Sequence, residues 1–320
     1  MFADLYKGVK WLDIQVRHFS FESKYDDVKV YGVCMIPDNP IGIVLMVHGM
    51  CEHKGRFLHM MRSLSERGYI TLMHDCRGHG ESVKKKEDIG YCYASKEVGY
   101  VADIHKISQQ IKKEYPNLPL FLYGHSMGSL AARVFLRNHD DEIDGLIVAG
   151  CPAYNSLVPV GLWGLKLLRQ IKGEGYRSML SQKVVLGSFE NRFKHEKRPY
   201  AWLAAKESVA AEFQKDELCM FTYTVNGFET LLHLMYVTYK AIGYQVENPD
   251  LPILFISGMD DPCYTNERGW QQAIERMQQL GYHDIQDIRY EGMRHEIHNE
   301  EDNERVFSDI DTFCRRIIGK

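Results

Sequence analysis

Short runs of apolar residues alternate along the chain with longer segments in which apolar positions recur at helical spacing. Runs that are apolar at every position are typical of parallel strands whose two faces are both covered by helices. The predicted strands span residues 42–49, 69–75, 119–124, 144–150, 251–258 and 285–292, and the predicted helices span 54–68, 94–115, 127–138, 266–281 and 303–318. This alternation predicts an α/β fold with a mostly parallel central sheet flanked by helices.

Two parts of the chain depart from the alternation. The first forty residues contain LDIQVRHFSFES and VKVYGVCMIP, in which apolar and polar residues alternate, so we expect antiparallel strands at one edge of the sheet. Between Pro152 and Gln245 the sequence has no strand-like run, and its composition is typical of helices with aromatic residues. We expect a helical cap here, over the carboxyl-terminal edge of the sheet, where open α/β sheets bind ligands.

The predicted organisation therefore has three parts. Residues 1–152 form the first part of a core, residues 153–245 form the helical cap, and residues 246–320 complete the core. With 320 residues, of which 45% are hydrophobic, the chain is long enough to bury a large core.

Composition narrows the possible partners and compartments. The net charge of −4 and the isoelectric point near 6.4 give no basic surface for a nucleic acid, so we expect no nucleic-acid partner. The N-terminal segment MFADLYKGVKWLDI lacks the apolar run of a signal peptide, and no stretch is long enough to span a bilayer. The eight cysteines form no C-x-x-C pair, and we interpret them as reduced thiols. The sequence thus predicts a cytoplasmic protein.

A G-x-S-x-G motif lies between a predicted strand and a predicted helix, in the stretch FLYGHSMGSLAARVF. In this context the motif predicts a nucleophile elbow, a sharp turn that strains the serine backbone and lifts its hydroxyl above the sheet. Gly124 and Gly128 supply the small residues that allow the strand and the helix to approach. Ser126 is therefore the predicted nucleophile.

A serine hydroxyl needs a base, and that base needs an acid to hold its tautomer. Asp261 follows a predicted strand in ISGMDDPCY, and His295 follows the last predicted strand in YEGMRHEIHNE, so both should open on the same edge as Ser126. Asp260 is expected to point away. We expect His298 to begin a helix or to contact solvent.

The negative charge of the reaction should be met by two backbone N–H groups, which we assign to Met127, after the nucleophile, and to Met50, in the loop after an early strand. The stretch HDCRGHGES is expected to form a tight turn beneath the site, with His79 as a polar loop residue. The stretch HEIH at 295–298 lacks the H-E-x-x-H spacing of a zinc site, so no metal is predicted.

Together these motifs resemble the monoacylglycerol lipase and lysophospholipase branch of the α/β-hydrolase family, which also includes serine aminopeptidases. The resemblance runs from about Ile43 to the C-terminus and is carried by HGMCEHKGRF, DCRGHGES, YGHSMGS, GMDDP and GMRHEI. It implies hydrolysis of carboxylic esters of glycerol or related lipids, through an acyl-enzyme and without a cofactor. Related chains have a glycine where this chain has Cys51, so the shape of its oxyanion loop is in question.

The expected substrate is a single-chain lipid ester. The predicted cap is unusually apolar, and we expect Leu162, Trp163 and Leu165 to line an acyl tunnel or to rest against a membrane or micelle. Two alternatives stay open. A short-chain esterase or a serine aminopeptidase would use the same triad, and the aminopeptidase would need acids near the site, for which Glu190, Glu196 and Glu207 are candidates. A ligand-binding receptor with little turnover is less compatible with an intact triad.

Overall fold

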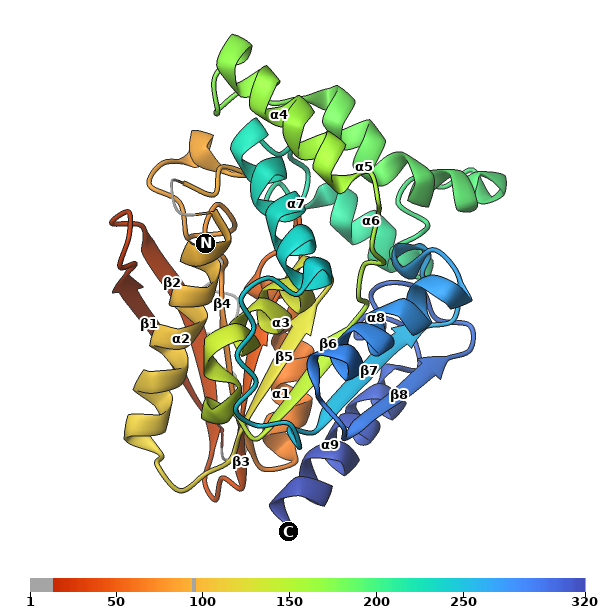
Figure 1. Ribbon diagram of the computed structural model, residues 1–320. Coiled ribbons are helices and arrows are strands. Elements are labelled where there is room, and N and C mark those ends of the chain that lie inside the picture. Colours follow the sequence, from red (N-terminus) through yellow and green to blue (C-terminus); the bar gives the residue numbers. More distant parts are fainter. Residues whose placement is uncertain (1–13, 94–95, 320) are drawn as a thin grey trace.

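The computed structural model describes residues 14–93 and 96–319, and its centre is one eight-stranded sheet (Figure 1). The order of the strands is β1-β2-β4-β3-β5-β6-β7-β8, with β1 and β2 antiparallel to each other and β2 antiparallel to β4. All other neighbours are parallel. The strands are β1 (Ile14–Glu22), β2 (Lys29–Pro37), β3 (Gly42–Val47), β4 (Tyr69–His74), β5 (Leu120–His125), β6 (Gly145–Ala149), β7 (Ile253–Gly258) and β8 (Ile285–Tyr290).

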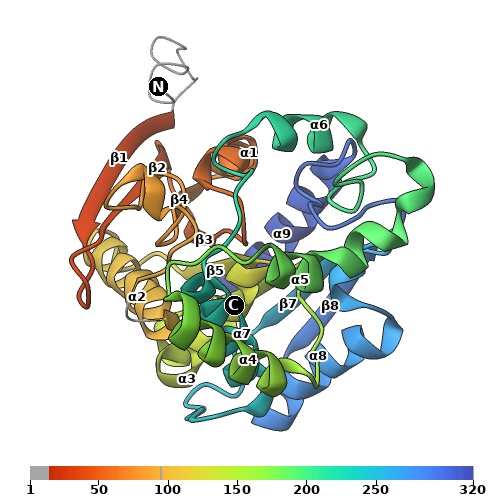
Figure 2. The same ribbon diagram turned by 90° about the horizontal axis from the view of Figure 1, so that it is seen from above.

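Helices cover both faces of the sheet, as Figures 1 and 2 show. One face carries α1 (Leu58–Glu66) and α9 (Asn303–Ile318), and the other carries α2 (Lys96–Glu114), α3 (Met127–His139) and α8 (Glu267–Leu280). Short 3₁₀ turns complete the connections: η2 (Lys54–Phe57), η3 (Lys86–Asp88), η4 (Asp140–Glu142), η5 (Lys194–Glu196) and η6 (Pro262–Tyr264).

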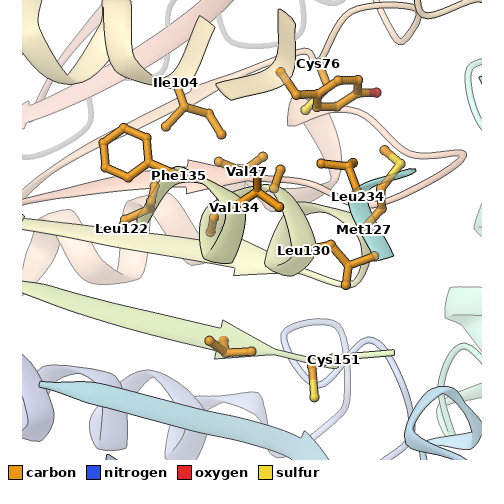
Figure 3. Close-up of a cluster of buried hydrophobic side chains, with 14 of the residues drawn as sticks. Val47, Cys76, Ile104, Leu122, Met127, Leu130, Val134, Phe135, Cys151 and Leu234 are labelled. Atoms are coloured by element: carbon orange, nitrogen blue, oxygen red, sulfur yellow. The ribbon is translucent and has the colours of Figure 1, made fainter. Parts of the chain in front are cut away.

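The fully apolar strands contribute side chains to two separate cores, because side chains alternate between the faces of a sheet. In β3, Leu45 and Val47 pack toward α2 and α3, whereas Val44 and Met46 pack toward α1 and α9. Figure 3 shows the first of these cores, where Val134 of α3 lies among residues of β3, β5 and α2. Each fully buried aliphatic side chain contributes about 1.5–3 kcal/mol. A strand buried on both faces needs such residues at every position.

The order of the strands reverses between β3 and β5. From β3 the chain continues to β4 on one side, and β5 then pairs with β3 on the other side. At such a reversal the loops that follow the two strands leave in opposite directions and open a crevice at the carboxyl edge. The predicted oxyanion loop follows β3 and the predicted nucleophile follows β5, so the topology brings both to this crevice.

Four helices lie between β6 and β7, and Figure 1 shows them over the ends of the parallel strands. They are α4 (Val158–Lys172), α5 (Met179–Arg192), α6 (Glu207–Lys215) and α7 (Val225–Lys240). The last of them, α7, packs into the core against α3, where the Thr238 hydroxyl donates to the Leu234 carbonyl of its own helix at 2.7 Å and lies 3.4 Å from the Leu130 carbonyl oxygen. By contrast, α4 and α5 expose several large apolar side chains.

The sequence predicted this α/β-hydrolase architecture correctly. All six predicted strands and all five predicted helices are present, with ends displaced by a few residues, and the antiparallel strands occupy the edge formed by β1 and β2. Parts of two predicted elements, residues 12–13 and 94–95, lie outside the described residues, as does the N-terminal segment. Within the described ranges, no helix combines the length and the apolar character that crossing a bilayer requires.

Candidate active site

Ser126 lies at the turn between β5 and α3, and its backbone is strained. Its φ of 53° and ψ of −118° are rarely adopted by residues with a side chain. A Cβ added at Gly124 would lie 2.5 Å from the Gly128 carbonyl oxygen, and one at Gly128 would lie 2.2 Å from the Val47 carbonyl oxygen. The two glycines are therefore required by the close approach of helix and strand, which holds the Ser126 hydroxyl above the sheet.

The loops after β7 and β8 bring Asp261 and His295 together. Nδ1 of His295 donates to the two carboxylate oxygens of Asp261, at 3.1 and 3.0 Å. Asp261 is fully buried, and it also accepts from the Ser257 hydroxyl at 2.7 Å and from the Cys263 N–H at 2.8 Å. Because a carboxylate can only accept, Nδ1 carries the proton of the imidazole and Nε2 is free to accept another.

The charge of Asp261 is maintained by these donors. Burial alone would raise the pKa of its carboxyl, but His295, the Cys263 N–H and the Ser257 hydroxyl together hold the pKa below its ordinary value. The adjacent Asp260 is exposed. Asp261, the aspartate chosen from the sequence, therefore lies against His295, whereas its neighbour Asp260 does not.

Ser126 and His295 line the same cavity, which has a volume of about 270 Å³. A Cβ at Gly150 would lie 3.1 Å from Cε1 of His295. The absence of a side chain at this glycine therefore leaves room for the imidazole at the end of β6. Within residues 14–93 and 96–319, the hydrogen-bond partner of His295 Nε2 is the Cys263 thiol at 3.7 Å, not the Ser126 hydroxyl. Hydrogen bonds between nucleophile and base are often long without substrate and tighten when it binds.

The loop after β3 lies against the nucleophile. A Cβ at Gly49 would lie 2.8 Å from Cβ of Ser126, which places the following residue, Met50, beside the serine. Met127 begins α3, and the first N–H groups of a helix have no partner within it. Both Met50 and Met127 line the cavity with Ser126. The structure thus gathers the two predicted N–H donors at one place.

A buried ion pair between Glu52 and His125 connects this loop to the elbow. One carboxylate oxygen of Glu52 accepts from the Gly49 N–H at 2.5 Å and from Nδ1 of His125 at 2.8 Å. Nε2 of His125 donates to the backbone carbonyl of His295 at 3.2 Å. The pair therefore touches the oxyanion loop, the residue before Ser126 and the loop of His295. Sequence reasoning gave Glu52 and His125 no role, although both lie inside the quoted motifs.

The surroundings of this pair favour the charged form of both members. Burial would raise the pKa of Glu52, but the charge and hydrogen bond of His125 lower it well below its ordinary value. Burial would lower the pKa of His125, but the Glu52 carboxylate raises it. A paired buried charge is retained, whereas removal of one partner leaves the other desolvated and unpaired.

Cys51 occupies a backbone conformation that favours glycine. Its φ is 57°, and its buried thiol points to the Phe221 carbonyl at 3.6 Å. A side chain strains the backbone in this conformation, whereas a glycine would adopt it without strain. Burial raises the pKa of the Cys51 thiol, so it packs as a small apolar group rather than as a thiolate.

Two histidines differ from their expected surroundings. His298 was expected to begin a helix or to contact solvent, but it is fully buried, and its ring stacks on Phe57 with centroids 4.1 Å apart. It lies in the turn before α9, where no part of its side chain is exposed to solvent. His79 is also buried, and its Nε2 accepts from the Tyr223 hydroxyl at 2.5 Å. The turn formed by HDCRGHGES does lie beneath the site, where Asp75 accepts from the Lys54 N–H at 2.8 Å.

The wall of the cavity opposite the sheet comes from α5 and α7 and is mostly apolar. On α5 it is formed by Met179, Gln182, Val185, Leu186 and Phe189. The structure places the three predicted substrate-binding residues elsewhere: Trp163 is 68% exposed, Leu165 is buried in the core, and Leu162 lies with Trp163 in a separate surface depression. None of the three lines the cavity of Ser126 in the described part of the chain.

Among the residues that the structure describes, three groups of side chains have donor atoms close enough to one another for a metal ion: Asp261–Cys263–His295, His53–Asp216–Cys219 and His105–His139–Glu142. Each is already linked by hydrogen bonds. In the third group, both imidazoles bond to one oxygen of Glu142, at 3.0 and 2.8 Å, and their rings are stacked with planes 20° apart. One ion cannot lie in both of these ring planes, as good coordination by two histidines requires.

Comparisons with known proteins agree with this geometry. The family model described as serine aminopeptidase S33 matches residues 38–302. A monoglyceride lipase homolog of Monkeypox virus is 27% identical over 183 residues, which is 56% of this chain and 62% of the viral protein. A monoacylglycerol lipase of Mycolicibacterium smegmatis is 28% identical over 127 residues, which is 40% of this chain and 43% of that protein. The chain thus matches less than two thirds of the length of these relatives.

The fold extends over nearly the whole chain in a solved structure. A thermostable carboxyl esterase from Bacillus coagulans, in complex with glycerol, has a TM-score of 0.86 and 27% sequence identity, and the match covers 95% of this chain and 99% of the esterase. Because the match leaves out only about a twentieth of the chain, it includes most of the segment between β6 and β7.

Proposed function

The chain belongs to the S33 serine aminopeptidase family, and from that membership we propose that it is a serine hydrolase that cleaves carboxylic esters of single-chain lipids, such as monoacylglycerols or lysophospholipids. One observation carries the proposal: Ser126, in its strained turn, shares an apolar cavity with His295, whose Nδ1 is held by a buried, charged Asp261. An apolar cavity accepts an acyl chain, and this trio supplies a nucleophile with its base.

The proposed reaction has two halves. The Ser126 hydroxyl turns from its resting position toward Nε2 of His295, which takes the proton as Oγ attacks the ester carbonyl carbon. Asp261 stabilises the resulting imidazolium. The imidazolium then gives its proton to the alcohol that leaves, and an acyl-enzyme remains on Ser126. In the second half, His295 takes a proton from water, the hydroxide attacks the acyl carbon, and the fatty acid leaves as Ser126 regains its proton.

The N–H groups of Met50 and Met127 are the proposed oxyanion hole. Each such donor is worth about 2.7–4 kcal/mol of transition-state stabilisation in measured cases. The Glu52 carboxylate supports this assignment because it binds the Gly49 N–H and thereby fixes the His48–Gly49 peptide, the neighbour of the peptide that carries the Met50 N–H. A loop held by a buried ion pair loses little freedom when the oxyanion forms.

The segment 153–245 is the proposed cap, set between core parts 1–152 and 246–320. Two contacts support a cap that is tied to the site. Glu300, five residues after His295, accepts from the N–H groups of Ala205 and Lys206 at 2.8 and 3.1 Å, at the start of α6. Arg294 forms an ion pair with Glu196 of η5. Movement of these helices would thus act directly on the loop that carries His295.

Contact with a membrane or micelle through this cap is a further part of the proposal. Exposed apolar side chains gather on α4, α5 and the loop between them, which is unusual for a surface in water. They are Leu157, Val160, Trp163, Leu167, Ile171, Tyr176, Met179, Leu180 and Val184. An apolar face of this kind is suited to rest at a lipid interface, from which a single-chain ester enters the cavity. A cytoplasmic location is supported by the eight cysteines, all of which are free thiols.

The acids near the cavity do not favour an aminopeptidase, which must hold the ammonium group of its substrate. Glu190 already accepts from the Tyr200 N–H and from Trp202 Nε1, and Glu196 pairs with Arg294. Of the acids that line the cavity, Glu52 pairs with His125, and Glu296 accepts from Arg56 at 2.5 Å. A carboxylate that is already paired attracts a second cation weakly.

A fluorophosphonate probe and a panel of three substrates test the proposal. The probe should label the protein, and Ser126→Ala should abolish labelling and lower kcat by about six orders of magnitude. The purified protein should hydrolyse a monoacylglycerol faster than a short nitrophenyl ester and should leave an aminoacyl anilide intact. Labelling that persists in Ser126→Ala would contradict the nucleophile, and preferential cleavage of the anilide would contradict the ester as substrate. Absence of turnover with all three substrates, despite labelling, would favour a receptor.

A further inference from the structure

The face of α5 that lines the cavity contains one polar residue. Met179, Val185, Leu186 and Phe189 are apolar, and Gln182 lies among them, one turn after Met179. Residues three and four apart share a face of a helix, so the position of Gln182 in this row is fixed by the helix itself. On the opposite face of α5 the exposed side chains include Leu180 and Val184, each 74% exposed. Lys183 and Ser188 are exposed as well, so the open side mixes polar and apolar residues, whereas Gln182 is the one polar residue of α5 among those that line the cavity.

The amide of Gln182 has an unused acceptor. Its Oε1 is buried and, in the part of the chain that the structure describes, has no hydrogen-bond partner. Other polar groups of the cap near the cavity are engaged: Trp202 Nε1 donates to Glu190 at 3.1 Å, and the Thr222 hydroxyl contacts the Met179 sulfur at 3.2 Å. Buried polar atoms are nearly always paired, because an unpaired one loses its hydrogen bonds to water without replacement. In the described residues the lining of the cavity holds two such atoms, Gln182 Oε1 and Glu52 Oε2, and a molecule bound in the cavity can supply the missing partner of Gln182.

The place of Gln182 along α5 separates it from the proposed reaction. Phe189 contacts Trp202, with ring centroids 5.2 Å apart, and Trp202 contacts the ring of His295 at 5.3 Å. These contacts mark the end of α5 that lies near the imidazole. Gln182 precedes Phe189 by seven residues, or about 10 Å along the helix axis. A group bound at Gln182 therefore belongs to a part of the substrate that is remote from the scissile ester bond.

From these observations we propose that the Gln182 amide forms a hydrogen-bonding subsite that recognises a hydroxyl group of the substrate, remote from the ester. The hydroxyl donates to Oε1, and the surrounding apolar side chains exclude water from the bond. This inference rests on the proposed ester hydrolysis and adds a requirement to it. The hydroxyl has two possible sources, the alcohol part of the ester, as in a monoacylglycerol, or the acyl chain, as in a hydroxy fatty acid.

A subsite of this kind gives selectivity rather than tight binding. A substrate with the hydroxyl pairs the buried amide, whereas a substrate without it leaves the amide unpaired in the closed complex. Sites built around a buried hydrogen bond reject an analogue that lacks the bonding group much more strongly than apolar pockets reject an extra methylene. The expected signature is a change in the ratio of kcat/KM between matched substrates.

The test uses three esters of the same acyl length and two variants. The esters are the ethyl ester of a plain fatty acid, the monoacylglycerol of that acid, and the ethyl ester of the acid with a mid-chain hydroxyl. In Gln182→Leu the apolar row of α5 is complete, and in the control, Gln170→Leu, the same replacement is made at an exposed position of α4. Thermal unfolding of both variants is measured in parallel to verify folding.

For the wild type we expect one of the hydroxylated esters to have the higher kcat/KM. Gln182→Leu should reduce the ratio of that value to the plain-ester value by about tenfold, and Gln170→Leu should leave the ratio unchanged. The ester that shows the effect identifies the source of the hydroxyl. Ratios that are equal in the wild type and in a folded Gln182→Leu would overturn the subsite but not the hydrolase. A wild type that cleaves none of the three esters would overturn the proposed function, and the subsite with it.

Discussion

The loops at the sheet edge and the helices above them differ in how the polar groups that carry the proposed function are bonded. Around Ser126, the carboxylate of Asp261 accepts from three different residues, and Glu52 and His125 pair within the core. On α5, by contrast, Oε1 of Gln182 is buried without a partner, and large apolar side chains face outward. On the sheet side the catalytic carboxylate and its imidazole are bonded to each other within the protein, whereas on the helix side the Gln182 amide has an acceptor left for a ligand.

This difference corresponds to two tasks. Catalytic groups work best when they are already held in position, because no reorganisation is then needed at the moment of reaction. Selection of a substrate and contact with a lipid interface require surfaces that stay unsatisfied until the partner arrives. Substitutions on the two sides should therefore have different signatures: losses of turnover and stability at the sheet edge, and changes of selectivity and interfacial binding on α5.

The largest effect is expected from Asp261→Asn. An asparagine at this position offers an N–H where the carboxylate accepted, so the imidazole of His295 is held in the wrong tautomer. We expect kcat to fall by about 10⁴-fold, as in other triads of this kind, while the protein still folds. The adjacent Asp260→Asn is a matched control, because Asp260 is exposed, and it should retain kcat. Steady-state rates with a nitrophenyl ester measure both. Equal losses in the two variants would contradict the role of Asp261.

The next effect concerns stability and its dependence on pH. Glu52→Gln removes the partner of a buried, protonated His125, and we expect a loss of about 3 kcal/mol in the free energy of unfolding near pH 6. An exposed acid, Glu217, is 85% exposed in its ion pair with Lys86, so Glu217→Gln is a suitable control that should change stability little. Chemical denaturation of the three proteins measures the difference.

The sign of the pH dependence follows from the two pKa directions. The pKa of Glu52 is lowered from 4.5, so its stabilisation is present above that value and is lost as the pH falls toward the folded pKa. The pKa of His125 is raised from 6.5, so its stabilisation is present below that value and is lost as the pH rises through the folded pKa. The difference between wild type and Glu52→Gln should thus be largest between about pH 5 and 6.5 and smaller on either side. A difference that is constant with pH would show that the pair is not charged.

A smaller effect is expected on the helix side. The double variant Leu180→Ser and Val184→Ser removes two exposed apolar side chains of α5, and we expect about tenfold weaker binding to phosphatidylcholine vesicles, because less apolar area enters the interface. Co-sedimentation measures the binding, and hydrolysis of a monomeric soluble ester should be unchanged. Val98→Ser, on α2, is the control for an exposed apolar side chain outside this surface. Vesicle binding that is unaffected by the double variant would show that this face of α5 does not contact the lipid interface.

The sequence predicted one side of this comparison much better than the other. Ser126, Asp261 and His295 each follow a strand within a local motif, and strands buried on both faces leave an unambiguous apolar pattern. The Glu52–His125 pair joins positions 73 residues apart, and no local pattern indicates such a pairing. His298 appears polar in the sequence, but Phe57 covers it in the fold.

On the helix side, local pattern was misleading. The most apolar stretch of the predicted cap is α4, which suggested Leu162, Trp163 and Leu165 as the wall of the substrate cavity. In the fold, α4 packs against α7, and α5 is the helix over Ser126. The sequence of α5 has apolar residues on both of its faces, since one lines the cavity and the other is exposed. The direction in which an apolar helix faces depends on its packing partners, and a single sequence does not contain that information.

The smallest effect separates backbone strain from side-chain packing at Cys51. Its φ of 57° is unfavourable for any residue with a Cβ, and its buried thiol packs beside Phe221. Cys51→Ala keeps the strained Cβ and loses the sulfur contact, whereas Cys51→Gly loses both. If strain is stored in this loop, Cys51→Gly should be more stable than Cys51→Ala by about 1 kcal/mol, although glycine usually destabilises a folded chain relative to alanine. Denaturant unfolding of the two variants gives the difference directly. A glycine variant that is less stable than the alanine variant would mean that the loop adopts another conformation in solution, and the assignment of Met50 to the oxyanion hole would then lose its support.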